Sequence, residues 1–381
     1  MLTELPERTS IELSTGTLGF ADVSKTDLDA YCDFAARANP KRGFLIVSKV
    51  LGRHIPASPT DMRGAMDQIA AKIPSDLTGP IVILGMAETA TALGQGVFAA
   101  YQRMNPDQQV VYLQSSRQLV GNAEIIARFE EGHSHASTHL IQVADVDIED
   151  IVRTARTLVI VDDECSTGKT YVAVANAMLE AMPKLELVAT CCITDWSGFG
   201  YIKNMPRPTL PISLVSGLMT WTASQVPDVP ALASGSNAAG IAPVTGMGSR
   251  SGLRNPEKAA RSPIDVKPGE RILVLGEGEH SYEALLVAEE IEASGGIAAV
   301  QCITRSPALL GGAMQSKSHF TDSYGSGAPC FLYNMLGHEP DRVLIVSEIT
   351  ANQVEEARAA IGVLGAHTPV EIILCNYAEE E

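Results

Sequence analysis

Apolar runs of strand length alternate with segments of helical periodicity along most of this chain, and no other feature limits the fold as strongly. Helices are predicted between most of the runs, as at 88–104 and 170–182. The predicted strands of the first half are 43–51, 80–87, 109–116, 157–161 and 185–194. Apolar strands joined by helices are typical of a parallel sheet that helices cover. We therefore expect an α/β protein with a parallel central sheet.

A second, shorter alternation of this kind follows a change in texture. Residues 217–263 are rich in Gly, Ser, Pro and Ala, which predicts a linker. Strand-like and helix-like segments then alternate again from Arg271 to Tyr377. With 381 residues, the chain is long enough for two domains with cores of their own. We expect a first domain over 1–216 and a smaller, Rossmann-like α/β domain over 264–381, and we find no internal repeat in the sequence.

Composition and charge exclude several classes of protein. The net charge of -17 argues against a general nucleic-acid binder, which would need a basic face. No apolar run is long enough to cross a bilayer, and the opening "MLTELPERTS" lacks the pattern of a secretion signal, so we expect a cytoplasmic protein without membrane contact. The seven cysteines show no paired CxxC spacing and are expected to be reduced thiols.

The stretch "LVIVDDECSTGKT", residues 158–170, carries the strongest chemical signal. The predicted strand 157–161 brings Asp162 and Asp163 to its carboxyl end, where open α/β sheets bind ligands. The following turn offers hydroxyl groups and the backbone amides of a helix N-terminus, which together form an anion cradle. Its residues are Ser166, Thr167, Gly168, Lys169 and Thr170. A phosphate seat beside two carboxylates fits a ribose 5-phosphate.

Two other interpretations of this stretch compete with a sugar-phosphate site. Gly168, Lys169 and Thr170 match the end of a Walker A loop, but that loop needs a glycine where Asp163 stands. The remaining alternative is an acidic turn that only caps a helix. Two adjacent acids ahead of a Ser-Thr-Gly turn are more than a cap requires.

Residues 158–170 resemble the phosphoribosyl-diphosphate motif of type I phosphoribosyltransferases, with four apolar residues, two acids and a Thr-Gly-Gly-Thr-like loop. The match departs at Lys169, where many members have glycine. The resemblance implies the parallel-sheet fold of that family and 5-phosphoribosyl 1-diphosphate as a substrate. It also implies Mg²⁺ as cofactor, held with the substrate by Asp162 and Asp163.

Two further segments resemble elements of the same family, in the same order. The loop at 84–94 resembles its diphosphate-binding loop, which implies donor contacts from Ala87, Glu88 and Thr89. The segment 115–139 resembles its mobile basic loop. That likeness implies that three residues act at the reacting centre: Arg117, His133 and His135. From the residues alone, a zinc site and a solvated loop stay open as alternatives for the histidines.

Candidate contacts to an acceptor come from the N-terminal region and from the strand end after the phosphate loop. In the family the N-terminal segment forms a hood over the acceptor, which makes Lys49 and His54 candidates. Trp196 follows the predicted strand 185–194 and is a candidate for stacking on a planar acceptor. Packing in the core is an equally open role for Trp196.

The second domain resembles that of one subgroup of this family. The chain resembles the phosphoribosyltransferases of bacterial tellurite-resistance operons, in which a domain named for a Thr-Arg-Ser-Pro signature follows the transferase domain; here the signature is 304–307. Two polar segments follow predicted strands there and should meet at one edge of the sheet. They contribute the candidate residues Gly276, Glu277, Glu279, Thr304, Arg305 and Ser306. Arg305 is a candidate to hold an anion, while a purely structural role remains open, and no reaction follows for this domain.

These observations lead to one expected function and two rivals. We expect a magnesium-dependent transfer of ribose 5-phosphate to a base-like small-molecule acceptor with release of diphosphate. A regulator that binds phosphoribosyl ligands without turnover fits the same loops, and so does a nucleotide phosphoribosyl hydrolase or phosphorylase. We expect a homodimer, and the resemblance implies partner enzymes of the same operon in a biosynthetic pathway linked to stress.

Overall fold

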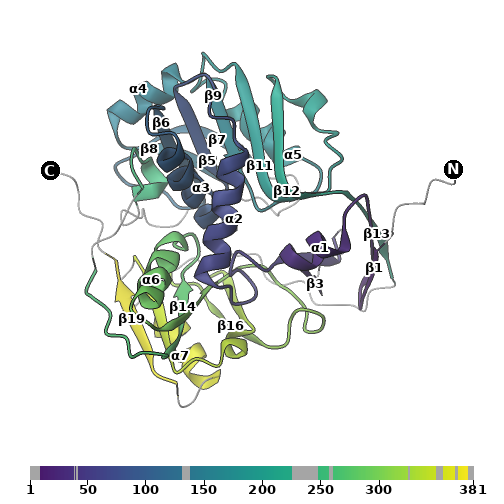
Figure 1. The fold of residues 1–381 in the computed structure, drawn as a ribbon, viewed down its shortest axis with the longest axis vertical. Helices are drawn as coiled ribbons and strands as arrows, with labels where there is room; N and C mark the ends of the chain where they lie inside the picture. The colour runs from purple at the N-terminus through teal and green to yellow at the C-terminus, as the bar shows by residue number, and fades with distance from the viewer. Residues whose placement is uncertain are drawn as a thin grey trace.

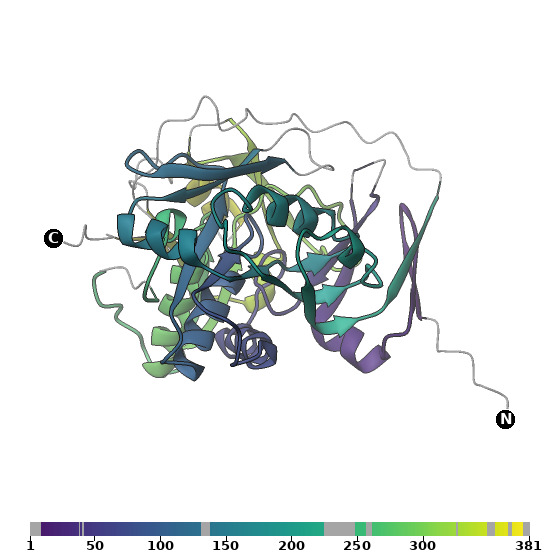
Figure 2. The same ribbon diagram turned by 90° about the horizontal axis from the view of Figure 1, so that it is seen from above.

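The computed structural model describes residues 9–37, 39, 42–130, 138–224, 248–256, 261–324, 327–348, 355–364 and 368–375. It is an α/β fold with a mostly parallel central sheet, as predicted. The first sheet lies in the upper part of Figure 1 and the second domain in the lower part, with α2 between them. A small group of strands near the N-terminus stands to one side. Figure 2 shows the same arrangement from above.

The first sheet has the order β10-β11-β9-β5-β6-β8-β7, and β12 pairs with β11. Its parallel strands are β5 (Ile81–Gly85), β6 (Val110–Ser116), β9 (Thr157–Val161), β10 (Glu164–Cys165), β11 (Leu187–Asp195) and β12 (Thr209–Ser216). The antiparallel strands at one edge are β7 (Glu124–Glu130) and β8 (Thr138–Val143). Every residue of β5 and β9 is buried, which explains why these strands are continuous apolar runs.

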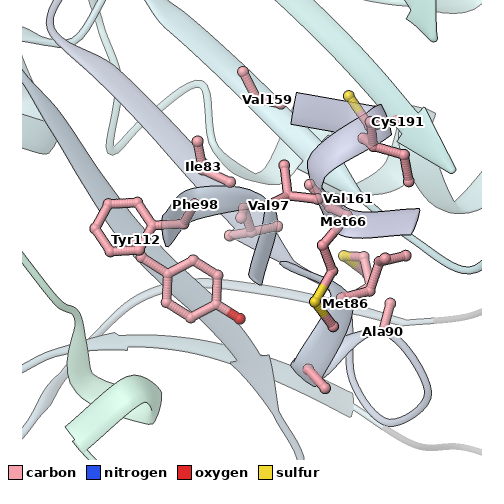
Figure 3. Close-up of a cluster of buried hydrophobic side chains, with 14 of the residues drawn as sticks. Met66, Ile83, Met86, Ala90, Val97, Phe98, Tyr112, Val159, Val161 and Cys191 are labelled. Carbon is pink, nitrogen blue, oxygen red and sulfur yellow. The ribbon is translucent and has the colours of Figure 1, made fainter. Parts of the chain in front are cut away.

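Helices cover this sheet. They are α2 (Pro59–Lys72), α3 (Thr91–Met104), α4 (Val146–Thr154) and α5 (Lys169–Ala177). α3 lies so close to β5 that a Cβ at Gly94 would stand 2.5 Å from the Cα of Gly85. Glycine at both positions therefore brings the start of α3 against the end of β5. The core formed there includes Met66, Ile83, Phe98 and Tyr112 (Figure 3).

The N-terminal region forms a small antiparallel unit beside the sheet, which we call the hood. Its elements are β1 (Thr9–Leu13), β2 (Gly16–Ala21), α1 (Lys25–Tyr31), β3 (Cys32–Ala36), β4 (Phe44–Ser48) and β13 (Leu218–Ala223). β13 pairs with β2, although it falls in the segment expected to be a linker. The alternating sequence "LMTWTA" is a strand signal that the surrounding Gly- and Ser-rich texture concealed.

The second domain has a four-stranded parallel sheet of order β15-β14-β18-β19. Its strands are β14 (Arg271–Gly276), β15 (Ile297–Cys302), β18 (Arg342–Ser347) and β19 (Val370–Leu374), with helices α6 (Tyr282–Ala293) and α7 (Glu355–Leu364). A hairpin of β16 (Lys317–Thr321) and β17 (Pro329–Tyr333) is inserted after β15. Short 3₁₀ turns are η1 (Ile202–Asn204), η3 (Gly248–Ser251) and η4 (Met335–His338).

The two sheets share one continuous interface. α6 packs against α2 and α3, and one buried apolar cluster includes Met66 of α2, Leu285 of α6 and Val300 of β15. The segment after β4 covers the edge of β15, because Ala57 and Val300 exchange backbone hydrogen bonds of 3.0 and 2.8 Å. None of the helices described is long and apolar enough to cross a membrane. The seven cysteines are buried and free.

Candidate functional site

The candidate site lies at the carboxyl ends of three neighbouring parallel strands. β5 pairs with β6 on one side and with β9 on the other. The loops that follow these strands therefore lie at one edge of the sheet, as parallel strand ends do. These loops are the three segments in which the sequence predicted donor contacts.

The loop after β9 leads through β10 into the N-terminus of α5. Gly168 has φ +71°, and a Cβ there would lie 2.1 Å from Cγ of Tyr201, so only glycine fits. α5 begins at Lys169 with no side-chain cap, which leaves its first amides available to an anion. Thr167 and Lys169 are exposed beside them. Backbone, hydroxyl and ammonium groups thus meet at the start of α5, and their role as a phosphate cradle stays a prediction.

The two aspartates before this loop have different environments. Asp163 donates its backbone N–H to Oδ1 of Asp162 at 2.9 Å. Burial and the charge of Glu164 raise the pKa of Asp163 to about 6, against the opposing effects of Asp162 and Arg42. Arg42 is itself held by both carboxylate oxygens of Glu164, at 2.7 and 2.8 Å. An added cation would favour the charged form of Asp163.

Magnesium fits this donor set. Mg²⁺ prefers oxygen ligands and is commonly bound through one or two carboxylates together with substrate phosphates. Asp162 and Asp163 supply two carboxylates next to the phosphate cradle. Within the described residues, no cluster of three or more His, Cys, Asp or Glu forms a cage that would hold a metal by itself. The two carboxylates are thus a donor set that Mg²⁺ accepts when other oxygen ligands complete it.

The loop after β5 is held by buried hydrogen bonds. Met86 donates its backbone N–H to Val161 O at 2.9 Å, and Ala87 donates its own to Ser115 Oγ at 2.9 Å. Ser115 Oγ in turn lies 3.2 Å from Nδ1 of His139, whose ring stacks on Phe129. The Ala87–Glu88 peptide bond in this loop is cis. Burial and the charge of Arg117 lower the pKa of His139 to about 3, so this imidazole is neutral near pH 7.

Glu88 points its carboxylate at arginines from other segments. It forms an ion pair with Arg53, which also donates to Gly278 O of the second domain at 3.0 Å. Arg117 Nη1 lies 3.9 Å from Glu88 Oε2. Burial works to raise the pKa of Glu88, but the charges of Arg53, Arg305 and Arg117 outweigh it, so the pKa is lowered. Through Arg53, Glu88 therefore links the loop after β5 to the second domain.

The second domain reaches the same place through Glu279. Its carboxylate accepts hydrogen bonds from Ser116 Oγ at 2.7 Å, from Arg117 N at 2.9 Å and from Arg250 Nε at 2.8 Å. Arg250 also pairs with Glu348 at 2.6 Å, although it comes from the segment expected to be a linker. Arg250 is fully buried and joins the two acids of the second domain to each other.

A cavity lies between these groups and joins both domains. It encloses about 450 Å³ of space that no atom fills, part of it open to solvent, and about 20 Å³ of this can hold the centre of a water molecule. Its lining residues are Glu88, Arg117, Gln118, Arg250, Glu277, Gly278, Glu279, Ile303, Arg305, Phe320, Asp322, Ser323, Tyr324 and Cys330. A ligand larger than water therefore requires a side chain at the cavity to move. Arg117, with 24% of its side chain exposed, is one such group.

The structure brings some of the predicted second-domain residues together and not others. Glu277, Glu279 and Arg305 line the cavity. Thr304 and Ser306 are occupied within their own turn, where Ser306 N donates to Thr304 Oγ1 at 3.1 Å. Gly276 lies at the end of β14, where a Cβ would stand 2.7 Å from His280 O.

The three candidate acceptor residues have separate surroundings. Trp196 is buried and packs edge-on against Phe20, with ring centroids 5.1 Å apart. His54 is buried against Tyr333 of the second domain, 5.8 Å between ring centroids. Lys49 donates to Asp29 O at 2.6 Å. Their role in acceptor binding stays a prediction.

Other predicted residues lie elsewhere or outside the description. His133 and His135 lie outside the described residues. The segment 115–139, expected as a loop, contains β7 and the start of β8, because "EIIARFE" has the alternation of an edge strand. Arg53, Arg250 and Gln118 line or support the cavity and were not singled out from sequence. Arg53 stands beside His54, Gln118 beside Arg117, and Arg250 between two serines, and none of these local patterns indicates a cavity between two domains.

Comparisons with known proteins match two families, in order along the chain. Residues 31–216 match the family described as "Phosphoribosyl transferase", and residues 250–363 match the family described as "TRSP domain C terminus to PRTase_2". A search of the curated proteins finds no match.

Similar solved structures include three adenine phosphoribosyltransferases. The Rhodothermus marinus enzyme has 18% sequence identity and a TM-score of 0.33, over 50% of this chain and 99% of that one. The Giardia lamblia enzyme, complexed with 9-deazaadenine, has 16% identity and a TM-score of 0.35, over 50% and 96%. The Trypanosoma brucei enzyme, in complex with AMP, pyrophosphate and ribose-5-phosphate, has 15% identity and a TM-score of 0.35, over 50% and 78%. With two family matches in this order along most of its length, the chain carries a phosphoribosyl transferase domain that is followed by a TRSP domain.

Proposed function

We propose that this enzyme transfers ribose 5-phosphate from 5-phosphoribosyl 1-diphosphate to a small, base-like acceptor and releases diphosphate, with Mg²⁺ as cofactor. One observation carries the proposal. The loops after β6, β5 and β9 lie at one edge of adjacent parallel strands, and they supply a basic group, a small-residue loop and an anion cradle beside two carboxylates. This set matches the parts of the donor molecule one by one.

Each part of the donor has a partner among the described residues. The 5-phosphate is bound by the first amides of α5 with Thr167 and Lys169. Asp162 and Asp163 bind the ribose hydroxyls. A bound Mg²⁺ supplies positive charge that neutralises the diphosphate. Residues 87–89 hold the diphosphate, with the Ala87 amide kept in place by Ser115.

The chemistry then needs positioning and charge neutralisation more than an acid or a base. The C1–O bond breaks and its electron pair leaves with the diphosphate. The acceptor's lone pair forms the new bond to C1, and the acceptor's proton passes to solvent. Positively charged groups near the departing oxygen lower the barrier because they interact most strongly when charge has developed there. Arg117, at the end of β6, is the described side chain placed for this role.

A diphosphate-release assay tests the proposal. The full chain is incubated with 5-phosphoribosyl 1-diphosphate, Mg²⁺ and a panel of nucleobases and other nitrogen heterocycles. We expect release with at least one acceptor, and its loss in the double variant Asp162→Asn, Asp163→Asn. The exposed Asp147 on α4 provides the control variant Asp147→Asn, which should keep full activity. Donor binding without release for any acceptor would instead indicate a ligand-binding regulator, and consumption of a nucleotide without donor would indicate a hydrolase.

A further inference from the structure

Four neighbouring strands of the first sheet have the same topology as the sheet of the second domain. In the first domain, four strands have the order β6-β5-β9-β11, and in the second they have the order β15-β14-β18-β19. Counted along the chain, both orders are second, first, third, fourth. In both, a helix joins the first two strands and an antiparallel hairpin is inserted after the second. This repetition is not visible in the sequence.

Strand register extends the correspondence to single residues once one residue of each sheet is matched. Gly85 of β5 pairs with Gln114 of β6, and Gly276 of β14 pairs with Cys302 of β15. If the two glycines are equivalent, the residues three positions beyond each pairing are equivalent too. Glu88 then corresponds to Glu279, and Arg117 corresponds to Arg305. The same register, taken through β9 and β18, makes Asp163 equivalent to Glu348.

The inserted hairpins support the same alignment independently. Ser116 at the end of β6 pairs in antiparallel fashion with Leu140 of β8. Thr304, its equivalent beyond β15, pairs in antiparallel fashion with Phe331 of β17. The hairpins β7-β8 and β16-β17 therefore occupy equivalent positions. The order second, first, third, fourth is common among doubly wound α/β folds, so the matching hairpins and loop residues are the observations that relate these two domains.

The two repeats face each other through their equivalent loops. Arg117 N and Ser116 Oγ of the first donate to Glu279 of the second. Burial works to lower the pKa of Arg305, but the charges of Glu88 and Asp322 outweigh it and raise the pKa, so Arg305 lies within electrostatic reach of Glu88. The helix N-termini also meet, with Thr91 Oγ1 of α3 and Ser281 Oγ before α6 at 2.9 Å. The cavity lies between these loops.

We infer that the second domain is a second phosphoribosyl transferase-type core, and that its Arg305 completes the diphosphate site of the first by binding the leaving diphosphate together with Arg117 in the cavity between the two cores. The inference rests on the proposed function. It assigns a ligand, inorganic diphosphate, and a residue of the second domain to the same reaction. The electron pair of the broken C1–O bond leaves on the diphosphate, as above, and no further reactant is needed.

Hydrogen-bond accounting at the cavity favours a ligand rich in acceptors. Among the described residues, Arg117 Nε and Arg250 Nη2 are buried lining atoms with no hydrogen-bond partner. Unpaired buried donors are costly, and a ligand oxygen is one group that pairs them. Gln118 Oε1 is one acceptor in the same state, and the carboxylates of Glu88, Glu277, Glu279 and Asp322 also line the cavity. The two N–H donors without a partner are charged, which suits a phosphate-type oxyanion better than a neutral heterocycle.

The resting ion pairs are consistent with displacement by such an anion. Glu88 already lies among Arg53, Arg117 and Arg305, so a carboxylate occupies the region that a diphosphate would take. The contact of Arg117 with Glu88, at 3.9 Å, is longer than a hydrogen bond. Arg305 is oriented by Asp322, with Nη2 at 2.8 Å from Oδ2. A diphosphate that brings Mg²⁺ with it carries less net charge into this pocket.

Isothermal titration of the full chain with two separate probes tests the inference. The probes are inorganic diphosphate with Mg²⁺ and ribose 5-phosphate, which belong to different ends of the site. We expect Arg305→Gln to weaken diphosphate binding about ten- to a hundredfold, as for one lost charge-assisted contact, and to leave ribose 5-phosphate binding unchanged. The diphosphate affinity of Arg305→Lys should lie between those of the wild type and Arg305→Gln, because lysine keeps the positive charge but lacks the planar guanidinium group.

The matched control is Arg63→Gln. Arg63 has a similar exposure, 22% against 24%, and it also bridges the domains by pairing with Glu289 of α6 at 2.7 Å, but it does not line the cavity. It should leave both affinities unchanged. Wild-type affinity for diphosphate in both Arg305 variants would overturn the inference while the proposed function stands. Failure of the wild-type chain to bind either probe would overturn the proposed function itself.

Discussion

At the scale of single residues, Glu277 is the cavity carboxyl with the most unusual environment. Ser347 Oγ donates to its Oε2 at 2.8 Å, whereas Glu88, Glu279 and Asp322 each pair with an arginine. Burial is the main cause that raises the pKa of Glu277 to about 7. The pKa of this carboxyl is 4.5 in the unfolded chain and about 7 in the folded protein, so its ionisation disfavours the folded state at pH values above this range.

The first prediction follows from this pKa. Between pH 4.5 and 7 the folded state binds the extra proton, so stability should fall as pH rises through this window. Glu277→Gln removes the titration and should stabilise the protein at pH 8 by roughly 2 to 4 kcal/mol, with little effect at pH 4.5. Urea unfolding at several pH values measures this. Glu180→Gln, on the exposed surface, is the control, and equal pH profiles for all three proteins would contradict the assignment.

A second prediction concerns Gly168 in the phosphate loop. Gly168→Ala places a Cβ 2.1 Å from Tyr201 Cγ at a backbone with φ +71°, so the loop must shift. We expect a loss of roughly 1 to 3 kcal/mol in the free energy of unfolding, and weaker ribose 5-phosphate binding. Gly64→Ala is the control, since nothing lies within 4 Å of a Cβ there. Unchanged ribose 5-phosphate affinity in a folded Gly168→Ala protein would count against the phosphate cradle.

The residues of the candidate site differ in how far the sequence can predict them. Asp162, Asp163 and the turn to Thr170 form a continuous motif, so strand, carboxylates and helix start are predictable from local pattern. Arg250 lies about 29 positions before its partner Glu279 along the chain, in a segment whose composition suggests a linker. Its position depends on tertiary packing, which no local pattern records.

At the scale of elements, the diphosphate loop depends on β6 and β8 as much as on its own strand. The Ala87 amide is bonded to Ser115 at the end of β6, and Ser115 contacts His139 of β8. We therefore expect His139 to act as a positioning residue for this loop. The sequence placed His139 in a mobile loop, because the strand pair that buries it could not be read from a segment rich in Gly, Ser and His.

The third prediction tests this support. Ser115→Ala leaves the Ala87 N–H buried without its acceptor, which should cost roughly 1 to 3 kcal/mol of stability. Diphosphate binding should weaken because the loop loses its fixed position, while ribose 5-phosphate binding should stay the same. Titration with the two probes separates these effects. If Ser115→Ala lowers stability and leaves diphosphate affinity intact, the serine supports the fold and not the loop.

The secondary elements themselves were largely predictable. The strands expected at 109–116 and 157–161 are found at Val110–Ser116 and Thr157–Val161, because buried parallel strands are continuous apolar runs with clear ends. The hood strands were less visible, since they are short and half exposed. The repeated topology was not visible at all, because equivalent loops such as 85–88 and 276–279 share only two of their four residues.

At the scale of the whole molecule, the second domain is integrated with the first. One apolar cluster spans α2, α3, β5, β14 and α6, and the segment 52–57 covers the edge of β15. Gly52 has φ +61°, and a Cβ there would stand 2.4 Å from Val300 O, which shows how closely the two units approach. A shared core of this kind couples the stability of the two domains.

The last prediction concerns this coupling. We expect the full chain to unfold in a single calorimetric transition, with equal calorimetric and van't Hoff enthalpies, because neither domain keeps its core closed without the other. A chain that ends at Pro256 exposes the apolar surface of α2 and α3 that α6 covers, and it also loses the partners of Arg53 and Arg63 in the second domain. It should therefore melt at least several degrees lower or aggregate.

Arg63→Gln in the full chain is the control. It removes one interface ion pair and should lower the melting temperature only slightly, since a partly exposed pair contributes at most about 1 kcal/mol. Two separate transitions in the full chain, with the truncated chain retaining the melting temperature of one of them, would show two independent domains and would leave the cavity as a contact between separately stable units.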